Sequence, residues 1–232
     1  MIVKIQFRFL WSSFFFLLSS FFFFFWSRLL GRTMEEKFYY VVKDGKVEEV
    51  KEILRSNPNL KINWKNDKDN DRTALVSACQ NGHDSIVSIL LAHPDIDANS
   101  KGSNGYTPFN SARANGKTSC VRLLLHDSRV NPNEPNNFGE TPLRNAADNG
   151  SLDIIKLWIA SGREMDLGKP GDVTKTDAIG RAKKQGKTEV ASLLERFKSD
   201  ATKTRSEVRK ELRINGQYCC SFLLILFIHC DI

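Results

Sequence analysis

The sequence lacks the residue patterns that indicate catalysis or a metal centre. Among its 232 residues there is no G-x-S-x-G motif, no H-E-x-x-H motif and no constellation of paired carboxylates. The five cysteines form no C-x-x-C pair and no cluster with histidine at a metal-ligand spacing. Asp67, Asp69 and Asp71 alternate as in a calcium-binding loop, but the glycine and the closing glutamate of such a loop are missing. We therefore expect no enzyme, no cofactor and no metal ion.

A basic excess is missing from the central part of the chain. The whole chain carries a formal net charge of +7, but residues 34–200 contain 25 lysine and arginine residues against 24 aspartate and glutamate residues, a net charge of +1. The flanks carry the remaining +6. Nucleic-acid-binding domains concentrate their positive charge on the folded body. The charge distribution therefore argues against nucleic acid as a partner.

Charge is absent from residues 9–27, a run of 19 residues rich in phenylalanine. A bilayer core is spanned by about 20 apolar residues, so one interpretation is a signal-anchor helix of undecided orientation. A second is a cleaved secretory signal, although no A-x-A-like cleavage site follows. A third is an artefactual upstream extension (residues 1–33), because Met34 stands at the start of the first repeat. The first interpretation predicts association with a membrane, and the third predicts a cytoplasmic protein.

The C-terminal segment, residues 200–232, is charged and then apolar. Residues 200–214 carry charges of both signs, which favours a solvated helix or a disordered extension. Residues 218–230 are apolar but short for a membrane-spanning helix. Three interpretations remain open for them: a helix packed on the last repeat, an anchor modified at Cys219 and Cys220, or out-of-frame sequence.

Between these flanks the chain repeats one pattern at intervals of 37, 34, 34 and 36 residues. A glycine ends a short first helix in each unit: Gly45, Gly82, Gly116, Gly150 and Gly186. Apolar pairs or near-pairs follow four and five residues after each glycine. A second pair follows eight and nine residues after it, or one residue earlier in the last unit. This spacing places the apolar side chains on one face of a second helix.

The first helix of each middle unit begins with a capping threonine, Thr73, Thr107 or Thr141. A threonine hydroxyl accepts a backbone N–H at the helix start. The proline after Thr107 and after Thr141 falls in the first turn, where its missing N–H is not needed. An alanine five residues after each threonine lets neighbouring helices approach closely.

These features resemble the ankyrin repeat, which has a period of 33 residues and a T-P-L-H-x-A signature. The resemblance covers roughly residues 35–198. It implies an all-α solenoid of about five helix-turn-helix units with projecting hairpin loops. The uncharged run at residues 9–27 adds a hydrophobic N-terminal helix before the solenoid. The expected ankyrin domain, residues 34–199, divides into units at about 35–70, 71–104, 105–138, 139–175 and 176–199. The first and last units are irregular, as terminal repeats of an array are expected to be.

The chain departs from the signature in lacking its histidine. Val76, Asn110, Arg144 and Gly180 stand at that position. The hydrogen bonds that this histidine usually makes between neighbouring loops must be missing or replaced. We therefore expect modest stability.

A left-handed backbone is expected just before the capping threonines. Gly105 and Gly139 stand there in the third and fourth units, and Arg72 stands in the corresponding place of the second. A left-handed Arg72 would cost on the order of 1 kcal/mol. The Arg72→Gly substitution should then raise the melting temperature.

The resemblance implies protein–protein recognition by a monomeric adaptor or scaffold. In such arrays a protein partner is held by the loop tips and by the exposed, concave face of the first helices. The matching residues of this sequence are Trp64, Lys65, Asn66, Lys101, Asn104, Tyr106, Asn110, Arg113, Asn133, Glu134, Asn136, Phe138, Arg144 and Asp148. Tyr106 and Phe138 are candidate aromatic anchors, with packing between adjacent loops as the alternative. A membrane-tethered adaptor and a regulatory fragment of a larger enzyme are alternative functions.

Overall fold

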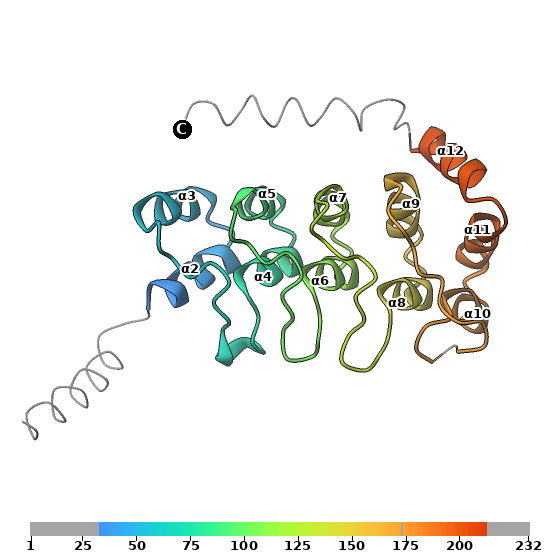
Figure 1. The fold of residues 1–232 in the computed structure, drawn as a ribbon, viewed down its shortest axis with the longest axis horizontal. Helices are drawn as coiled ribbons and strands as arrows, with labels where there is room; N and C mark the ends of the chain where they lie inside the picture. Colours follow the sequence, from blue (N-terminus) through green and yellow to red (C-terminus); the bar gives the residue numbers. More distant parts are fainter. Residues whose placement is uncertain (1–32, 173, 213–232) are drawn as a thin grey trace, which may run out of the picture.

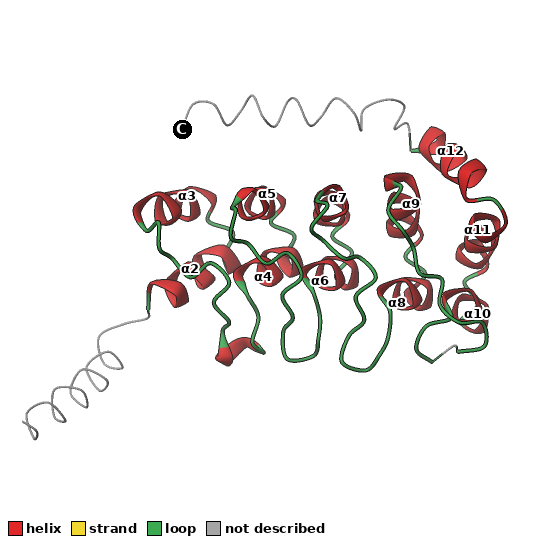
Figure 2. Cartoon of the chain, in the orientation of Figure 1, coloured by secondary structure: helices red, strands yellow, loops and turns green. Residues whose placement is uncertain are grey.

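The structure of the protein is a computed structural model that describes residues 33–172 and 174–212. Within these residues the chain is all-helical and forms five helix pairs in succession (Figures 1 and 2). The pairs are α2 (Met34–Lys43) with α3 (Val47–Ser56), α4 (Ala74–Asn81) with α5 (Asp84–Ala92), α6 (Pro108–Ala114) with α7 (Thr118–His126), α8 (Pro142–Asn149) with α9 (Leu152–Ser161), and α10 (Ala178–Lys184) with α11 (Thr188–Ser199). A 3-10 turn, η1 (Asp67–Asp69), and a final helix, α12 (Ala201–Glu211), complete the described elements.

The helices form two rows. The first helices of the pairs lie side by side in one row and the second helices lie in the other (Figure 1). The connections between pairs project as loops beyond the row of first helices. Each first helix contacts the first helix of the next unit, as repeats in a solenoid do. The predicted all-α solenoid of five units is therefore confirmed, while the hydrophobic segment 9–27 and residues 213–232 lie outside the described residues.

The predicted threonine caps are present in the three middle units. The hydroxyls of Thr73, Thr107 and Thr141 accept the backbone N–H three residues later at 3.4, 3.2 and 3.3 Å. In the last unit Asp177 caps α10 in the same way at 2.8 Å. A cap of this kind stabilises a helix by about 1 kcal/mol. Because each first helix has at most eight residues in these units, its cap contributes a large part of its local stability.

The expectation of a left-handed Arg72 is wrong. The left-handed residues of that loop are Asn70 and Asp71, with φ of 55° and 52°. Gly105 and Gly139 lie two residues before their threonines. The residue two before Thr73 is Asp71, so Asp71 and not Arg72 is the left-handed equivalent of these glycines.

Arg72 instead holds the loop through a charged cluster. Its Nη1 donates to Asp69 Oδ1 at 2.5 Å, while Tyr39 Oη and Lys43 Nζ donate to Asp69 Oδ2 at 2.8 and 2.6 Å. Burial alone would raise the pKa of Asp69, but the hydrogen bonds from Lys43 and Tyr39 outweigh it and lower the pKa. The cluster joins α2 to the first loop.

The core runs continuously between the two rows. The apolar faces of the second helices and the small residues of the first helices are buried together, including Ala78, Ala112 and Ala146 at 0% exposure. Phe109 and Trp158 meet edge to face with ring centroids 5.0 Å apart, which joins the third unit to the fourth. Cys79 and Cys120 are buried in this core as free thiols.

Neighbouring units are joined by a repeated asparagine contact that sequence analysis missed. Asn63, Asn99 and Asn133 each donate Nδ2–H to a backbone carbonyl about one unit further on, at 2.7, 2.7 and 3.2 Å. Each also accepts a backbone N–H two residues beyond that carbonyl, at 2.9, 2.6 and 3.0 Å. We call these three contacts the asparagine joints. They recur at intervals of 36 and 34 residues, which is the period of the array.

Helix α12 follows the last pair in the chain and packs on α9 and α11. Val208 and Thr204 are buried on its inner face. Arg205 and Arg209 donate through Nε to the carbonyls of Ile159 and Ala160, at 3.2 and 2.7 Å. These carbonyls end α9, where cationic side chains are favoured by the helix dipole. The charged stretch after residue 200 is therefore a docked helix over its described part.

Candidate interaction surface

The predicted partner-binding residues differ widely in exposure. Lys65, Asn104 and Phe138 are exposed. Six are half-buried: Trp64, Lys101, Tyr106, Asn133, Glu134 and Asp148. Five are buried: Asn66, Asn110, Arg113, Asn136 and Arg144. The expectation that these last five are exposed is wrong, and their contact with a partner stays a prediction.

Asn66 and Asn136 are buried because they close their own loops. The Asn66 Oδ1 atom accepts the N–H of Lys68 at 3.0 Å. The Asn136 Oδ1 atom accepts the N–H groups of Phe138 and Glu140, both at 3.0 Å. An asparagine that bonds backbone two residues ahead is a common turn device. Both residues therefore shape the loops and do not reach their tips.

Asn110 is buried because it bonds to the next loop. It stands at the signature histidine position, and its Nδ2 donates to the Glu134 carbonyl at 3.2 Å. The inter-loop bond that the histidine usually supplies is thus replaced in this unit. In the second unit, where Val76 has no polar group, Thr73 and Ser100 are joined by their hydroxyls at 3.0 Å.

Three further predicted residues also hold the loops together. Lys65 Nζ donates to the carbonyl of Lys101 at 2.9 Å, and Lys101 Nζ donates to that of Pro135 at 3.2 Å. Lys101 is also paired with Glu134 at 2.7 Å. The loops are therefore connected to one another along the array, which fixes their tips relative to each other.

Phe138 and Tyr106 remain as aromatic contact candidates, in different settings. Phe138 is 66% exposed at the tip of its loop, so packing between loops does not account for it. Tyr106 is half-buried and, with Asn104, lines a hollow of about 120 Å³ between α4 and α6. Arg72 and Gln80 line the opposite side of this hollow.

A row of charged residues follows the first helices from α6 to α10. Arg144 Nη1 lies 3.0 Å from Glu140 Oε1 and 4.0 Å from Asp148 Oδ2. Arg181 Nε and Gln185 Nε2 donate to Asp148 Oδ1 at 2.6 and 2.5 Å. The hydrogen bond from Arg181 lowers the pKa of Asp148. Sequence analysis missed Arg181, although it stands in α10 where the row continues.

Arg113 begins this row and differs from its other arginines. It is 3% exposed, and burial lowers its pKa to about 10. Its Nε and Nη1 atoms are buried without a hydrogen-bond partner among the described residues, and so is Nε of Arg144. Arg113 is therefore the one arginine of the row whose charge no described carboxylate neutralises by contact.

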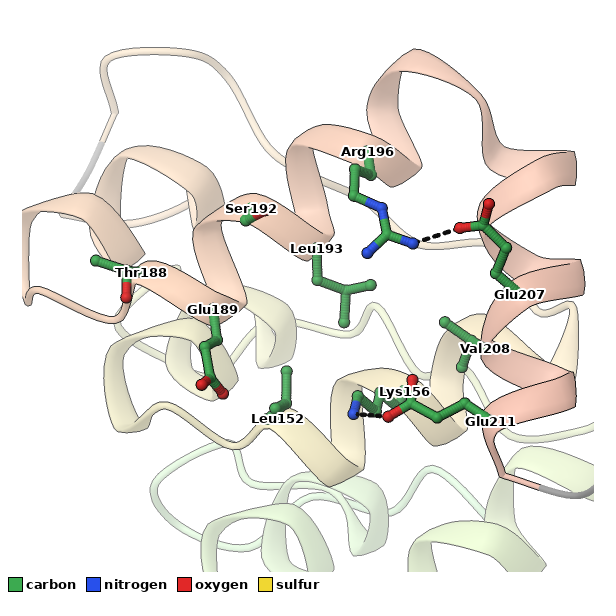
Figure 3. A pocket seen from close by; sticks show the side chains of 10 residues that line it. All are labelled: Leu152, Lys156, Thr188, Glu189, Ser192, Leu193, Arg196, Glu207, Val208 and Glu211. Atoms are coloured by element: carbon green, nitrogen blue, oxygen red, sulfur yellow. Dashed lines mark hydrogen bonds and ion pairs between the residues drawn. The ribbon is translucent and has the colours of Figure 1, made fainter.

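A second concave region lies between α9, α11 and α12, with a volume of about 460 Å³ (Figure 3). Leu152, Leu193 and Val208 contribute its apolar lining. Figure 3 shows four of its five charged side chains in pairs within the chain, Arg196 with Glu207 and Lys156 with Glu211. These pairs connect α12 to α9 and α11, so the groove lies along a packing contact within the chain.

The predicted membrane segment, residues 9–27, lies outside the described residues. Across residues 33–172 and 174–212, none of the helices combines the length and the apolar character needed to cross a bilayer.

Stacked helix pairs with connected, projecting loops define a repeat protein of the solenoid class. Two family models for ankyrin repeats match the sequence, one of three copies at residues 38–134 and one of many copies at residues 111–159. The chain belongs to the ankyrin repeat family. Ankyrin repeats are generally protein–protein interaction modules and typically lack enzymatic activity. No curated protein matches the sequence.

Proposed function

We propose that this protein is a non-enzymatic adaptor or scaffold that binds one protein partner through its loop tips and the concave face of its first helices. The observation that carries this proposal is Phe138, a large apolar side chain 66% exposed at a loop tip within an array of fixed loops. Buried aromatic anchors dominate many protein interfaces. Burying a phenylalanine side chain contributes about 1.5–3 kcal/mol, so Phe138 is the expected anchor.

The connections between the loops support binding as well. The Ser103 N–H donates to the Asn70 carbonyl at 2.8 Å, and the Asn137 N–H donates to the Asn104 carbonyl at 3.3 Å. A partner that meets these loops does not have to order them first. A surface already held in its binding conformation loses less entropy on association.

The predicted residues then divide into two roles. The exposed and half-buried side chains contact the partner, above all Asn104, Tyr106 and Phe138. The buried asparagines hold the loops that present these contacts. Replacing Asn136 should therefore weaken binding through loss of the loop conformation, whereas replacing Phe138 should weaken binding and leave folding unchanged.

Site-specific photocrosslinking in the native cell tests the proposal. A photoreactive phenylalanine analogue is placed at Asn104 or Phe138 in the full chain, and at Ser88 or Arg122 as controls. The control side chains are exposed on α5 and α7, in the row of second helices. We expect a discrete crosslinked protein from the first two positions and not from the controls. Equal crosslinking from all four positions, or none from the loops, contradicts the proposal.

A membrane-tethered adaptor is the second candidate, and the uncharged run at residues 9–27 favours it. The endogenous protein is separated into alkaline-washed membranes and soluble extract, and its N-terminal peptides are identified by mass spectrometry. Recovery in membranes with peptides from before Met34 supports the tethered form. A soluble protein that begins at Met34 supports a cytoplasmic binding module.

A further inference from the structure

Arg113 occupies a position that is small in the two neighbouring units, whereas the last unit has Lys183 there, exposed and paired with Glu195. Arg113 is the sixth residue after the capping threonine of its unit, where Cys79 and Ala147 stand in the neighbouring units. Both of those residues are 0% exposed and pack between first helices. A guanidinium has been placed where packing alone would favour a small side chain. Its presence therefore calls for an explanation other than packing.

The hydrogen bonding of Arg113 is incomplete. Its Nε and Nη1 atoms have no partner among the described residues, and Nε of neighbouring Arg144 has none either. Buried donors of this kind are rare in native structures, because each loses its water without gaining a protein acceptor. Three N–H-bearing atoms on these two arginines are unpaired. The one buried side-chain acceptor without a partner among the described residues is Asn110 Oδ1, so the unpaired donors exceed the acceptors.

The charges around Arg113 also do not balance. Tyr106, Glu140 and Arg144 are the titratable groups that act on it. Glu140 is in contact with Arg144, and Asp148 is in contact with both Arg144 and Arg181. The row Arg113, Glu140, Arg144, Asp148 and Arg181 thus has three positive and two negative charges. The surplus of one positive charge lies on the arginine that has no partner.

We infer that Arg113, together with Arg144, receives a side-chain carboxylate of the protein partner. The planar fork of an arginine matches the two oxygens of a carboxylate and holds it with parallel hydrogen bonds. A carboxylate supplies one negative charge, which equals the surplus of the row. A phosphate ester brings about 1.5 to 2 negative charges and exceeds it. The inference rests on the proposed function and specifies the chemistry of the partner as an acidic side chain.

The position of the site fits a bound protein. Arg113 lies on α6 and feels the charges of Tyr106 and Glu140, which precede the capping threonines of α6 and α8. Because Arg113 is only 3% exposed, the loop bases have to part for an acidic side chain of the partner to reach it. The same partner can then contact Phe138 and fill the site.

Nuclear magnetic resonance of the Arg113 Nε–H group in the full chain tests the site directly. Acetate is titrated as the probe, with chloride at equal ionic strength as the control and inorganic phosphate as the competing anion. We expect a saturable shift of the Arg113 signal with acetate that chloride does not produce. The exposed Arg122 is the matched control and should not shift. Arg113→Met identifies the signal, and Arg113→Lys serves if the methionine variant does not fold.

The outcomes separate this inference from the proposed function. Absence of an acetate-specific shift, or a shift with phosphate alone, overturns the carboxylate site even if crosslinking from Phe138 succeeds. A shift without any crosslinking leaves the site standing while the proposed function falls. When both succeed, Arg113→Met should lower the crosslinking yield from Phe138 at least tenfold, and Arg122→Met should leave it unchanged. An unchanged yield with Arg113→Met contradicts the assignment of the site to the partner.

Discussion

Gly105 has no room for a side chain, and its backbone is left-handed. Its φ is +75°, and a Cβ would lie 2.3 Å from Asn137 Oδ1 and 2.5 Å from Asn137 N. Gly116 has a similar φ of +65°, but nothing lies within 4 Å of a Cβ built there. The two glycines therefore separate the cost of the backbone conformation from the cost of crowding.

The Gly105→Ala substitution should destabilise the fold more than Gly116→Ala. The left-handed conformation costs an alanine about 1–2 kcal/mol, and this applies to both variants. Crowding against the next loop should add about 1–3 kcal/mol at Gly105. Urea denaturation monitored by circular dichroism measures both values. Equal losses in the two variants would show that the loops separate easily and are not held together.

Replacement of Arg72 by glycine should lower the melting temperature. The substitution removes the bond to Asp69 that supports the first loop, and it increases the freedom of the unfolded chain. We expect a loss of about 1–2 kcal/mol in the free energy of unfolding. Lys61→Gly, at an exposed loop position, is the control for the chain entropy alone. A gain in stability would restore the view that Arg72 is strained.

For single residues, the sequence predicts those features that depend on residues close together in the chain. The threonine caps were predictable because donor and acceptor lie three residues apart. The burial of Asn110 was not, because its acceptor is the carbonyl of Glu134 in the following loop. The resemblance to ankyrin repeats maps Arg113 to the exposed face of the first helices, and only the packed array shows that it is enclosed.

The charged contact between α8 and α10 should weaken in acid. The pKa of Asp148 is lowered below its ordinary value of 3.8, chiefly by the hydrogen bond from Arg181. A lowered pKa means that the ionised carboxylate stabilises the fold above the unfolded pKa, and that this contribution is lost as pH falls through the folded pKa. Asp148→Asn should therefore cost about 1 kcal/mol at pH 7 and progressively less below pH 4.

Urea midpoints of the wild type and Asp148→Asn between pH 2.5 and pH 7 measure this difference. Asp153→Asn is the control, because Asp153 is exposed on α9. A difference that stays constant over the whole pH range would show that Asp148 acts through shape and not through charge.

Helix α12 should depend on its buried face more than on its ion pairs. Val208 is 2% exposed, so Val208→Asp places a carboxylate in an apolar contact and should release the helix. Glu207→Gln removes only the exposed pair with Arg196, which contributes less than about 1 kcal/mol. Hydrogen exchange should rise across residues 201–211 in the first variant and not in the second. The reverse order would show that electrostatic pairing holds the helix.

Among the helices, the sequence predicts those that belong to the repeated pattern. The paired helices follow from the glycine breaks and the apolar spacing, which recur in every unit. The docking of α12 could not be predicted in this way. Arg205 and Arg209 bond to carbonyls 46 and 49 residues earlier in the chain, and nothing in the local pattern specifies that contact.

Across the whole molecule, a destabilising substitution should mainly unfold the unit that contains it. Phe38 is 2% exposed in α2, and Phe38→Ala should cost about 3–5 kcal/mol. Because each unit contacts its neighbours, the first unit should open before the rest. Hydrogen exchange should increase in α2 and α3 while the amides of α9 and α11 stay protected. A uniform increase along the chain would indicate that the array unfolds as a single body.

The asparagine joints should allow whole units to be inserted into the array or removed from it. Residues 99–132 contain both halves of one joint, since Asn99 bonds to Arg129 and Asn131 within that stretch. A duplicate of this stretch inserted after residue 132 would carry its own joint and meet Asn133 as the original does. Duplication or deletion of a whole unit therefore leaves the asparagine joints on either side intact. The length of the array should therefore change in steps of one unit when whole units are inserted or removed.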